Sequence, residues 1–256
     1  MFKAGLLLFL LLGFSGATFA AERTLVAEGD YVGQTKDGGK LLAHWKLWRL
    51  GSGEFEVLES PVKDASVIQI FRFDDKFLPI GYTLKTERSP ARPGQVASSM
   101  TVACQFKPQE LQCDTEYDGH SASASIPAKQ PYVFQPGEFY GLDFCWFLTG
   151  IVRLSSHSKE NEPVNVYVMT DREGHVGEIS LEMDNPIKLN PEGEETAEVL
   201  GKTQVVKRFE GSGLDELSEL RAISKGVVAS VGSKSNPSIG FALSNYKEYE
   251  PWGPDR

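Results

Sequence analysis

The sequence predicts a mainly β protein, with a largely antiparallel sheet and one buried apolar helix. Short runs with an apolar residue at every second position recur along most of the chain, as expected for strands with one buried face. Turn residues rich in Gly, Asp and Pro separate these runs. Helical segments do not alternate with the strands, which excludes a doubly wound nucleotide-binding fold.

The composition is that of a soluble, acidic, globular protein. The chain has 256 residues, a formal net charge of −9 and 41% hydrophobic residues. Its 15 Phe, 8 Tyr and 4 Trp argue against disorder, which requires few aromatic residues. No cluster of Lys and Arg offers the basic surface that phosphate binding needs, so we expect no nucleic-acid partner.

The first twenty residues have the features of a secretory signal peptide. One cation, Lys3, precedes an apolar stretch from residue 6 to 14, and Thr18 and Ala20 occupy the small-residue positions of a cleavage site. The apolar stretch is shorter than the roughly 20 residues of a bilayer-spanning helix. We therefore expect residues 1–20 to be removed, leaving a single β-rich domain over 21–256 in the periplasm or outside the cell.

The clearest strand lies at 78–85, where Leu78, Ile80, Tyr82 and Leu84 share one face. Seven further runs have the same period of two, at 41–50, 54–58, 67–73, 164–170, 177–183, 204–209 and 239–249.

A cysteine hairpin follows the clearest strand. If Pro108 and Gln109 form a two-residue turn, residue 106 faces 111 and Cys104 faces Cys113, at the close approach of a non-hydrogen-bonded pair. A disulfide can bridge such a pair, and export would favour its formation. The alternative is a redox-active pair, although the spacing is not Cys-x-x-Cys and no cation flanks either thiol. The third cysteine, Cys145, is expected to be a small buried hydrophobe.

Residues 137–153 are predicted to form a helix. Pro136 precedes this segment, and apolar residues surround almost its whole circumference, which favours burial against the sheet. Asp143 in this segment is either a buried acid with a raised pKa or a partner of Arg153 or of a backbone donor. A weaker helical pattern covers residues 214–223.

The sequence contains none of the common catalytic or metal-binding motifs. The four histidines are far apart, so no metal site and no cofactor is predicted. Nucleophile-elbow and phosphate-loop motifs are absent from the expected mature chain. The Glu-rich segment 185–198 does not match a calcium loop and is expected to be a solvated surface excursion.

Aromatic and aliphatic side chains on the predicted strands and helix are the candidate ligand-binding residues. Trp45 and Trp48, three residues apart on one strand, point to opposite faces, so at least one of them faces a core or a cavity. These side chains either fill an ordinary core or line an apolar concavity. The candidates are Trp45, Leu78, Ile80, Tyr82, Leu84 and Trp146.

Several short motifs follow one another in a recognisable order. They are Gly-Glu-Phe-Glu-Val at 53–57, Phe-Leu-Pro-Ile-Gly-Tyr at 77–82, the cysteine hairpin, the aromatic segment around Trp146, and Leu-Ser-Asn-Tyr at 243–246. This order resembles a secreted bacterial half-barrel family that is distantly similar to the LolA/LolB-type periplasmic lipoprotein carriers. The resemblance implies a curved antiparallel sheet, a half-barrel, that wraps one buried apolar helix in its concave face. It also implies a binding role rather than a catalytic one.

The predicted function is therefore non-catalytic binding of an apolar or amphipathic small molecule or lipid in the concavity of the curved sheet. Two alternatives stay open. One is a secreted hydrolase of glycans or envelope polymers that uses Asp and Glu for acid-base catalysis, with Asp143 as a candidate acid. The other is an envelope scaffold that binds proteins through an exposed sheet edge.

Overall fold

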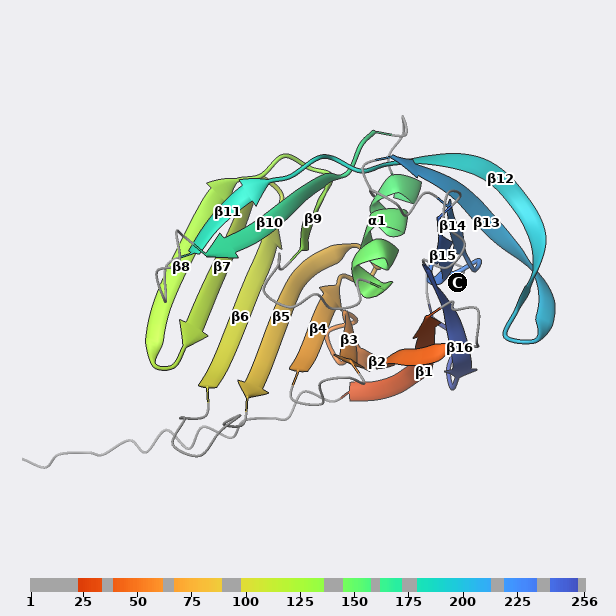
Figure 1. Ribbon diagram of the computed structural model, residues 1–256, viewed down its shortest axis with the longest axis horizontal. Helices are drawn as coiled ribbons and strands as arrows, with labels where there is room; N and C mark the ends of the chain where they lie inside the picture. The colour runs from red at the N-terminus through yellow and green to blue at the C-terminus, as the bar shows by residue number, and fades with distance from the viewer. Residues whose placement is uncertain are drawn as a thin grey trace, which may run out of the picture.

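The computed structural model describes residues 23–33, 39–61, 67–88, 98–135, 145–157, 162–171, 179–212, 219–233 and 240–252. Most of these residues belong to one large, curved antiparallel sheet that does not close into a barrel (Figure 1), as predicted. Thirteen strands form the sheet in the order β12-β13-β14-β15-β16-β1-β2-β3-β4-β5-β6-β7-β8. Their bounds are β1 Arg23–Gly33, β2 Lys40–Leu50, β3 Phe55–Pro61, β4 Val67–Phe73, β5 Pro79–Arg88, β6 Ser98–Lys107, β7 Glu110–Tyr117, β8 His120–Pro127, β12 Lys188–Val199, β13 Lys202–Ser212, β14 Glu219–Ala222, β15 Val228–Gly232 and β16 Gly240–Glu248.

A helix and a small second sheet cover the concave face of the large sheet (Figure 1). The small sheet has three strands, β9 (Tyr132–Gln135), β10 (Asn165–Asp171) and β11 (Ile179–Met183), with β9 parallel and β11 antiparallel to β10. The helix, α1, runs over Cys145–His157 and contacts β9 and β15. No helix in the part of the chain that the structure describes is long and apolar enough to cross a membrane.

The helix extends beyond the predicted end at Arg153. Of the predicted segment 137–153, residues 137–144 lie outside the described residues, and so does Asp143. Gly150 lies where α1 packs against the sheets: a Cβ atom at this position would meet Pro79 Cγ at 3.2 Å and Val133 Cγ1 at 3.5 Å. The absence of a side chain at Gly150 therefore lets the helix approach both β5 and β9.

Alternating burial shows which side of each strand faces the core. On β2, Ala43, Trp45 and Leu47 are buried, whereas Trp48 points to the convex face, where the Arg23 guanidinium carbon lies 4.5 Å from its ring centroid. The two tryptophans thus face opposite sides, as their spacing predicts. Across neighbouring strands the inner positions form continuous rows, such as Leu47, Val57, Phe71, Tyr82, Cys104 and Cys113.

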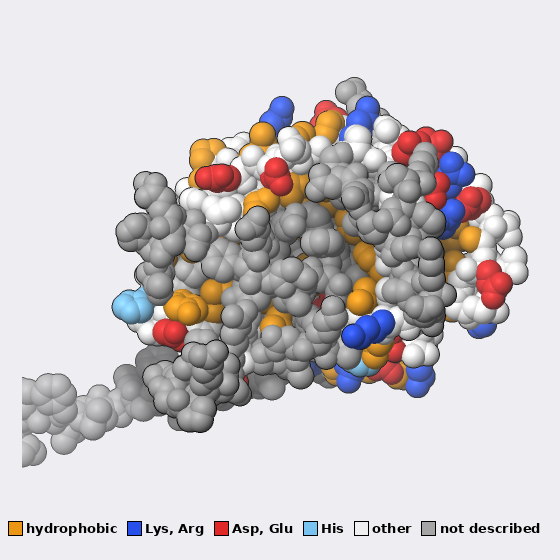
Figure 2. Space-filling model, in the orientation of Figure 1, with side chains coloured by type: hydrophobic (Ala, Val, Ile, Leu, Met, Phe, Trp, Pro, Cys, Tyr) orange, Lys and Arg blue, Asp and Glu red, His pale blue; other side chains and the backbone are white. Residues whose placement is uncertain are grey.

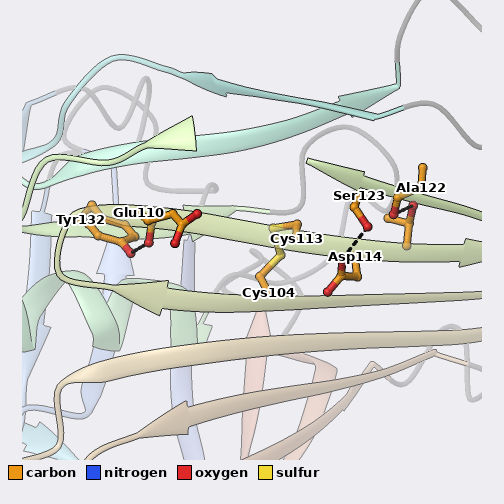
Figure 3. Close-up of a disulfide and its surroundings, with 8 residues drawn as sticks. Cys104, Glu110, Cys113, Asp114, Ala122, Ser123 and Tyr132 are labelled. Carbon is orange, nitrogen blue, oxygen red and sulfur yellow. Dashed lines mark hydrogen bonds between the residues drawn. A yellow bond between two sulfur atoms is a disulfide. The ribbon is translucent and has the colours of Figure 1, made fainter. Parts of the chain in front are cut away.

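The cysteine hairpin has the predicted register. Cys104 lies opposite Cys113 and Phe106 opposite Leu111, on strands joined by the turn at residues 108–109. The two cysteines form a disulfide with Cα atoms 4.1 Å apart, and both are buried on the concave face (Figure 3). On the opposite side of β7, the Ser123 hydroxyl donates to Asp114 Oδ1 at 2.6 Å.

Two predicted elements are wrong. The acidic segment over 185–198 is mostly exposed, as expected of a solvated surface, but it forms β12 instead of a loop. The predicted helix over 214–223 contains β14, with residues 214–218 outside the described part. Only Leu189 and Val199 of β12 are buried, and most of its other residues are exposed, so its sequence does not show a clear alternation of apolar and polar positions.

The β12–β13 hairpin bends back over the convex side of β14, β15 and β16 (Figure 1). Val199 and Val206 are buried there, and β12 shares a cleft with Ser230 of β15 and Ala242 of β16. Glu195 accepts a short hydrogen bond from Arg221 Nε at 2.5 Å and lies 3.7 Å from Arg208 Nη1. Acidic and basic side chains are correspondingly intermixed over this hairpin (Figure 2).

Candidate functional site

A groove opens beside the C-terminal end of α1, where several chain reversals meet. Its volume is about 660 Å³. The β4–β5 turn, the β6–β7 turn, the segment that leads into β9, and the end of α1 form its walls. We call it the hairpin groove; its lining residues are Asp74, Leu78, Pro79, Ile80, Phe106, Pro108, Gln130, Pro131, Tyr132, Leu154, His157 and Glu162.

Most of the lining is apolar and partly exposed. Leu78 and Ile80, two of the predicted ligand-binding residues, lie in this groove, and both are half-buried. An irregularity between Arg72 and Phe73 places two residues of β5, Pro79 and Ile80, against a single position of β4. This bulge turns the first residues of β5 out of the regular inner row, which leaves them accessible.

The pairing of β5 with β6 places Phe106 beside Ile80 in the groove. Gly81 lies opposite Gln105, so the next position along each strand brings Ile80 and Phe106 to the same level of the sheet. The predicted hairpin placed Phe106 opposite Leu111 but did not connect it with a binding site. The pairing of β5 with β6 was the signal that could have linked it to Ile80.

Asp74 shapes the β4–β5 wall of the groove. Its Oδ1 atom accepts hydrogen bonds from the backbone nitrogens of Lys76 at 3.0 Å and Leu78 at 2.7 Å. Two backbone hydrogen bonds also close the turn. The Asp74 nitrogen donates to the Leu78 carbonyl oxygen, and the Phe77 nitrogen donates to the Asp74 carbonyl oxygen, both at 2.9 Å. Asp74 therefore holds Leu78 in place, and both residues line the groove.

Tyr132 contributes an aromatic wall rather than a polar one. Its hydroxyl donates to the Glu110 carbonyl oxygen at 2.8 Å (Figure 3) and lies 2.6 Å from the Lys107 carbonyl oxygen, so it anchors the β6–β7 turn. Burial raises the pKa of this hydroxyl, which keeps it neutral as a donor. The ring packs against Phe106, with centroids 5.8 Å apart.

His157 closes the end of the groove at the last residue of α1. Its Nδ1 atom lies 2.7 Å from the Arg153 carbonyl oxygen. A carbonyl oxygen can only accept, so Nδ1 is the donor, and in the neutral ring Nε2 carries the lone pair. The exposed imidazole thus presents a hydrogen-bond acceptor at the rim.

The other four predicted ligand-binding residues are buried in the core. Trp45 and Trp146 meet edge to face with centroids 5.0 Å apart, and Phe73 lies 6.0 Å from Trp146. Tyr82 donates to Gln69 Oε1 at 2.9 Å and packs against Phe134, whereas Leu84 has no exposed surface. The structure therefore separates the candidates into an accessible pair in the groove and a group of four packed in the core, whose role in binding stays a prediction.

Sequence reasoning also missed Pro108, Pro131, Leu154 and His157 as groove residues. Leu154 and His157 are three residues apart on α1, a spacing that places both on one face of a helix. Pro108 and Pro131 come from two other segments, and no local spacing connects them with the helix. Among the described residues, no group of three or more His, Cys, Asp or Glu side chains could hold a metal ion.

No protein-family model, curated protein or solved structure matches this chain. The resemblance to the periplasmic lipoprotein carriers therefore stays an expectation from the sequence, and the function has to be inferred from the groove itself.

Proposed function

We propose that this protein binds an apolar or amphipathic small molecule or lipid in the hairpin groove. The observation that supports this most directly is the groove's volume of about 660 Å³ together with its walls of Leu78, Ile80 and Phe106. Ligand sites of small molecules occupy roughly 300–1,000 Å³ and combine apolar walls with a few polar groups. The polar side chains of the lining are Asp74, Gln130, His157 and Glu162, which could hold the polar part of an amphipathic molecule.

The proposal moves the expected site from the middle of the concave face to its rim. Between the sheet and α1, the aromatic side chains of Trp45, Trp146 and Phe73 pack on one another. Leu78 and Ile80 keep accessible surface, which is what a ligand needs to bury. The proposed compartment is periplasmic or extracellular, supported by the signal-like residues 1–20 and by the disulfide.

Extraction and mass spectrometry of the protein purified without detergent from its native compartment test the proposal. We expect a stoichiometric apolar or amphipathic compound, absent from an unrelated protein purified in the same way. Ile80→Asp places a charge on the apolar wall and should abolish this co-purification. Val205→Asp is the matched control, because Val205 is 54% exposed on β13 and does not line the groove. Loss of ligand in both variants, or in neither, contradicts the proposal.

The hydrolase alternative has one supporting observation, the presence of two carboxylates, Asp74 and Glu162, in the same groove. Two observations argue against it. One carboxylate oxygen of Asp74 already accepts hydrogen bonds from two backbone nitrogens of its turn, and most of the groove lining is apolar, whereas a glycan would need polar partners. Turnover of a glycan that disappears in Glu162→Gln would favour the hydrolase. A bound compound recovered unchanged after long incubation would favour binding.

A further inference from the structure

We infer that the ligand of the hairpin groove carries a primary ammonium group at its polar end. This inference rests on the proposed function and adds the chemistry of the head group. It comes from the polar side chains that line the groove, which are two carboxylates, one imidazole and the amide of Gln130, with no cation among them.

Two carboxylates supply negative charge at the groove. Glu162 is exposed, and Asp74 is half-buried with only its Oδ1 atom engaged by the turn. Among the described residues that line the groove there is neither Lys nor Arg. The nearby Lys107 ammonium is held by Glu110 Oε2 at 2.9 Å and Gln112 Oε1 at 3.1 Å, so its charge is directed to β7 rather than to the groove.

His157 and Tyr132 favour the same kind of head group. The Nδ1 hydrogen of His157 is used by the Arg153 carbonyl oxygen, so Nε2 is the ring atom left for a ligand. The Tyr132 hydroxyl, which could have served as a donor to a ligand, instead donates within the β6–β7 turn. A head group rich in donors therefore finds partners here, whereas a sulfate, phosphate or carboxylate meets like charge.

A primary ammonium fits these acceptors better than a quaternary one. It has three N–H donors, and charge-assisted hydrogen bonds are stronger than neutral ones. The alkyl part would lie along Leu78, Ile80 and Phe106, with the ammonium toward Asp74, His157 and Glu162. The expected ligand class is thus a long-chain amine or another amphiphile with a free amino group.

Calorimetric titration of the full chain with three probes of equal tail length tests this. The probes are dodecylammonium, dodecyl maltoside and dodecyl sulfate, each below its micelle concentration and at low salt. We expect one dodecylammonium per chain, bound about tenfold tighter than the maltoside, and the sulfate weakest. Raising the salt concentration should weaken the ammonium probe only, since exposed charges are screened.

Single substitutions distinguish the effect of the two groove carboxylates on binding from the effect of the protein's net negative charge. Glu162→Gln should weaken dodecylammonium binding by about two- to fivefold, the range of an exposed ion pair, and leave the maltoside unchanged. Asp74→Asn keeps an oxygen for the turn and should have a similar effect. Glu192→Gln removes the same charge on exposed β12 and should change neither affinity.

The outcomes distinguish the two proposals. Equal binding of all three probes, or tighter binding of the sulfate, overturns the ammonium inference but leaves the groove as the site if Ile80→Asp abolishes binding. An effect of Glu192→Gln equal to that of Glu162→Gln also overturns it. If none of the probes binds, the proposed function fails together with the inference.

Discussion

Trp45 of β2 and Trp146 of α1 meet edge to face beneath the helix, with ring centroids 5.0 Å apart and ring planes at 72°. Neither side chain has more than 1% of its surface exposed. Gly29, opposite Trp45 on β1, leaves room for the indole: a Cβ atom there would come within 2.8 Å of the ring. This contact joins the only described helix to the middle of the large sheet and makes the tryptophan pair the centre of the core.

Trp146→Ala should lower the free energy of unfolding by about 3–5 kcal/mol, because it removes a fully buried aromatic side chain and leaves a cavity next to Phe73 and Phe77. Urea denaturation measures this change. Trp48→Ala is the control: this side chain lies on the convex face below Arg23, and its loss should cost about 1 kcal/mol. An equal loss of unfolding free energy in the two variants would contradict the central position of Trp146 in the core.

Replacing Cys104 and Cys113 together by Ala should cost about 2–3 kcal/mol. The disulfide joins residues nine positions apart, and cross-linking a loop of this size restricts the unfolded chain by that amount in the chain-entropy model. Denaturation of the wild type with and without reductant, beside the double variant, checks the value. If reductant destabilises the double variant as much as the wild type, the bridge is not responsible for the effect.

Asp74→Ala should cost about 2 kcal/mol, since the turn loses a charged acceptor of two backbone hydrogen bonds. Asp74→Asn retains the oxygen and should cost less than about 1 kcal/mol. Asp75→Ala in the same turn provides the control and should change stability by less than about 0.5 kcal/mol, because this side chain is exposed. Thermal unfolding of the three variants ranks them.

Glu195 gives the stability a pH dependence in the acidic range. The hydrogen bond from Arg221 and the nearby charges hold the pKa of this carboxyl below its usual value of 4.5. A lowered folded-state pKa means that the contribution is complete above the unfolded-state value and is lost as the pH falls through the folded-state value. Because the pair is partly exposed, the contribution should be about 1 kcal/mol or less.

Glu195→Gln measures this contribution. The variant should be less stable than the wild type at pH 6–7, and the difference should vanish as the pH falls well below 4.5. Chemical denaturation across this range gives both curves. A difference that persists unchanged at the lowest pH would show that packing, not the ionised carboxylate, is responsible.

The strand pattern and the cysteine hairpin could be predicted because local rules govern them. Period-two burial identifies the inner faces of β2 and β4, and a two-residue turn sets the register that brings Cys104 opposite Cys113. The small sheet could not be predicted as a unit, since β9 and β10 pair in parallel over a long connection. For β12 the exposed glutamates conceal the few buried positions, so composition indicated a loop.

The same holds for the groove: residues close together in the sequence could be predicted to share a site, and residues from distant segments could not. Leu78 and Ile80 are two residues apart at the start of β5, and the sequence pattern predicted that they share one face. Leu154 and Pro131 reach the same groove from α1 and from the segment before β9. Their meeting depends on how α1 packs on β5, which is decided by tertiary contacts around Gly150 and not by any local spacing.

Gly150→Leu tests this packing directly. A side chain at this position would press on Pro79 Cγ, which a Cβ atom alone would approach to 3.2 Å, and on Val133. Overpacking of this kind costs about 1–3 kcal/mol, even though Leu favours helix more than Gly does. Gly232→Leu is the control, because a Cβ atom there would meet nothing within 4 Å. We expect Gly150→Leu to lower both the stability and the affinity for a groove ligand, since Pro79 lines the groove, while Gly232→Leu alters neither by more than about 0.5 kcal/mol. A Gly150→Leu protein with wild-type stability and affinity would show that the helix does not set the position of the groove wall.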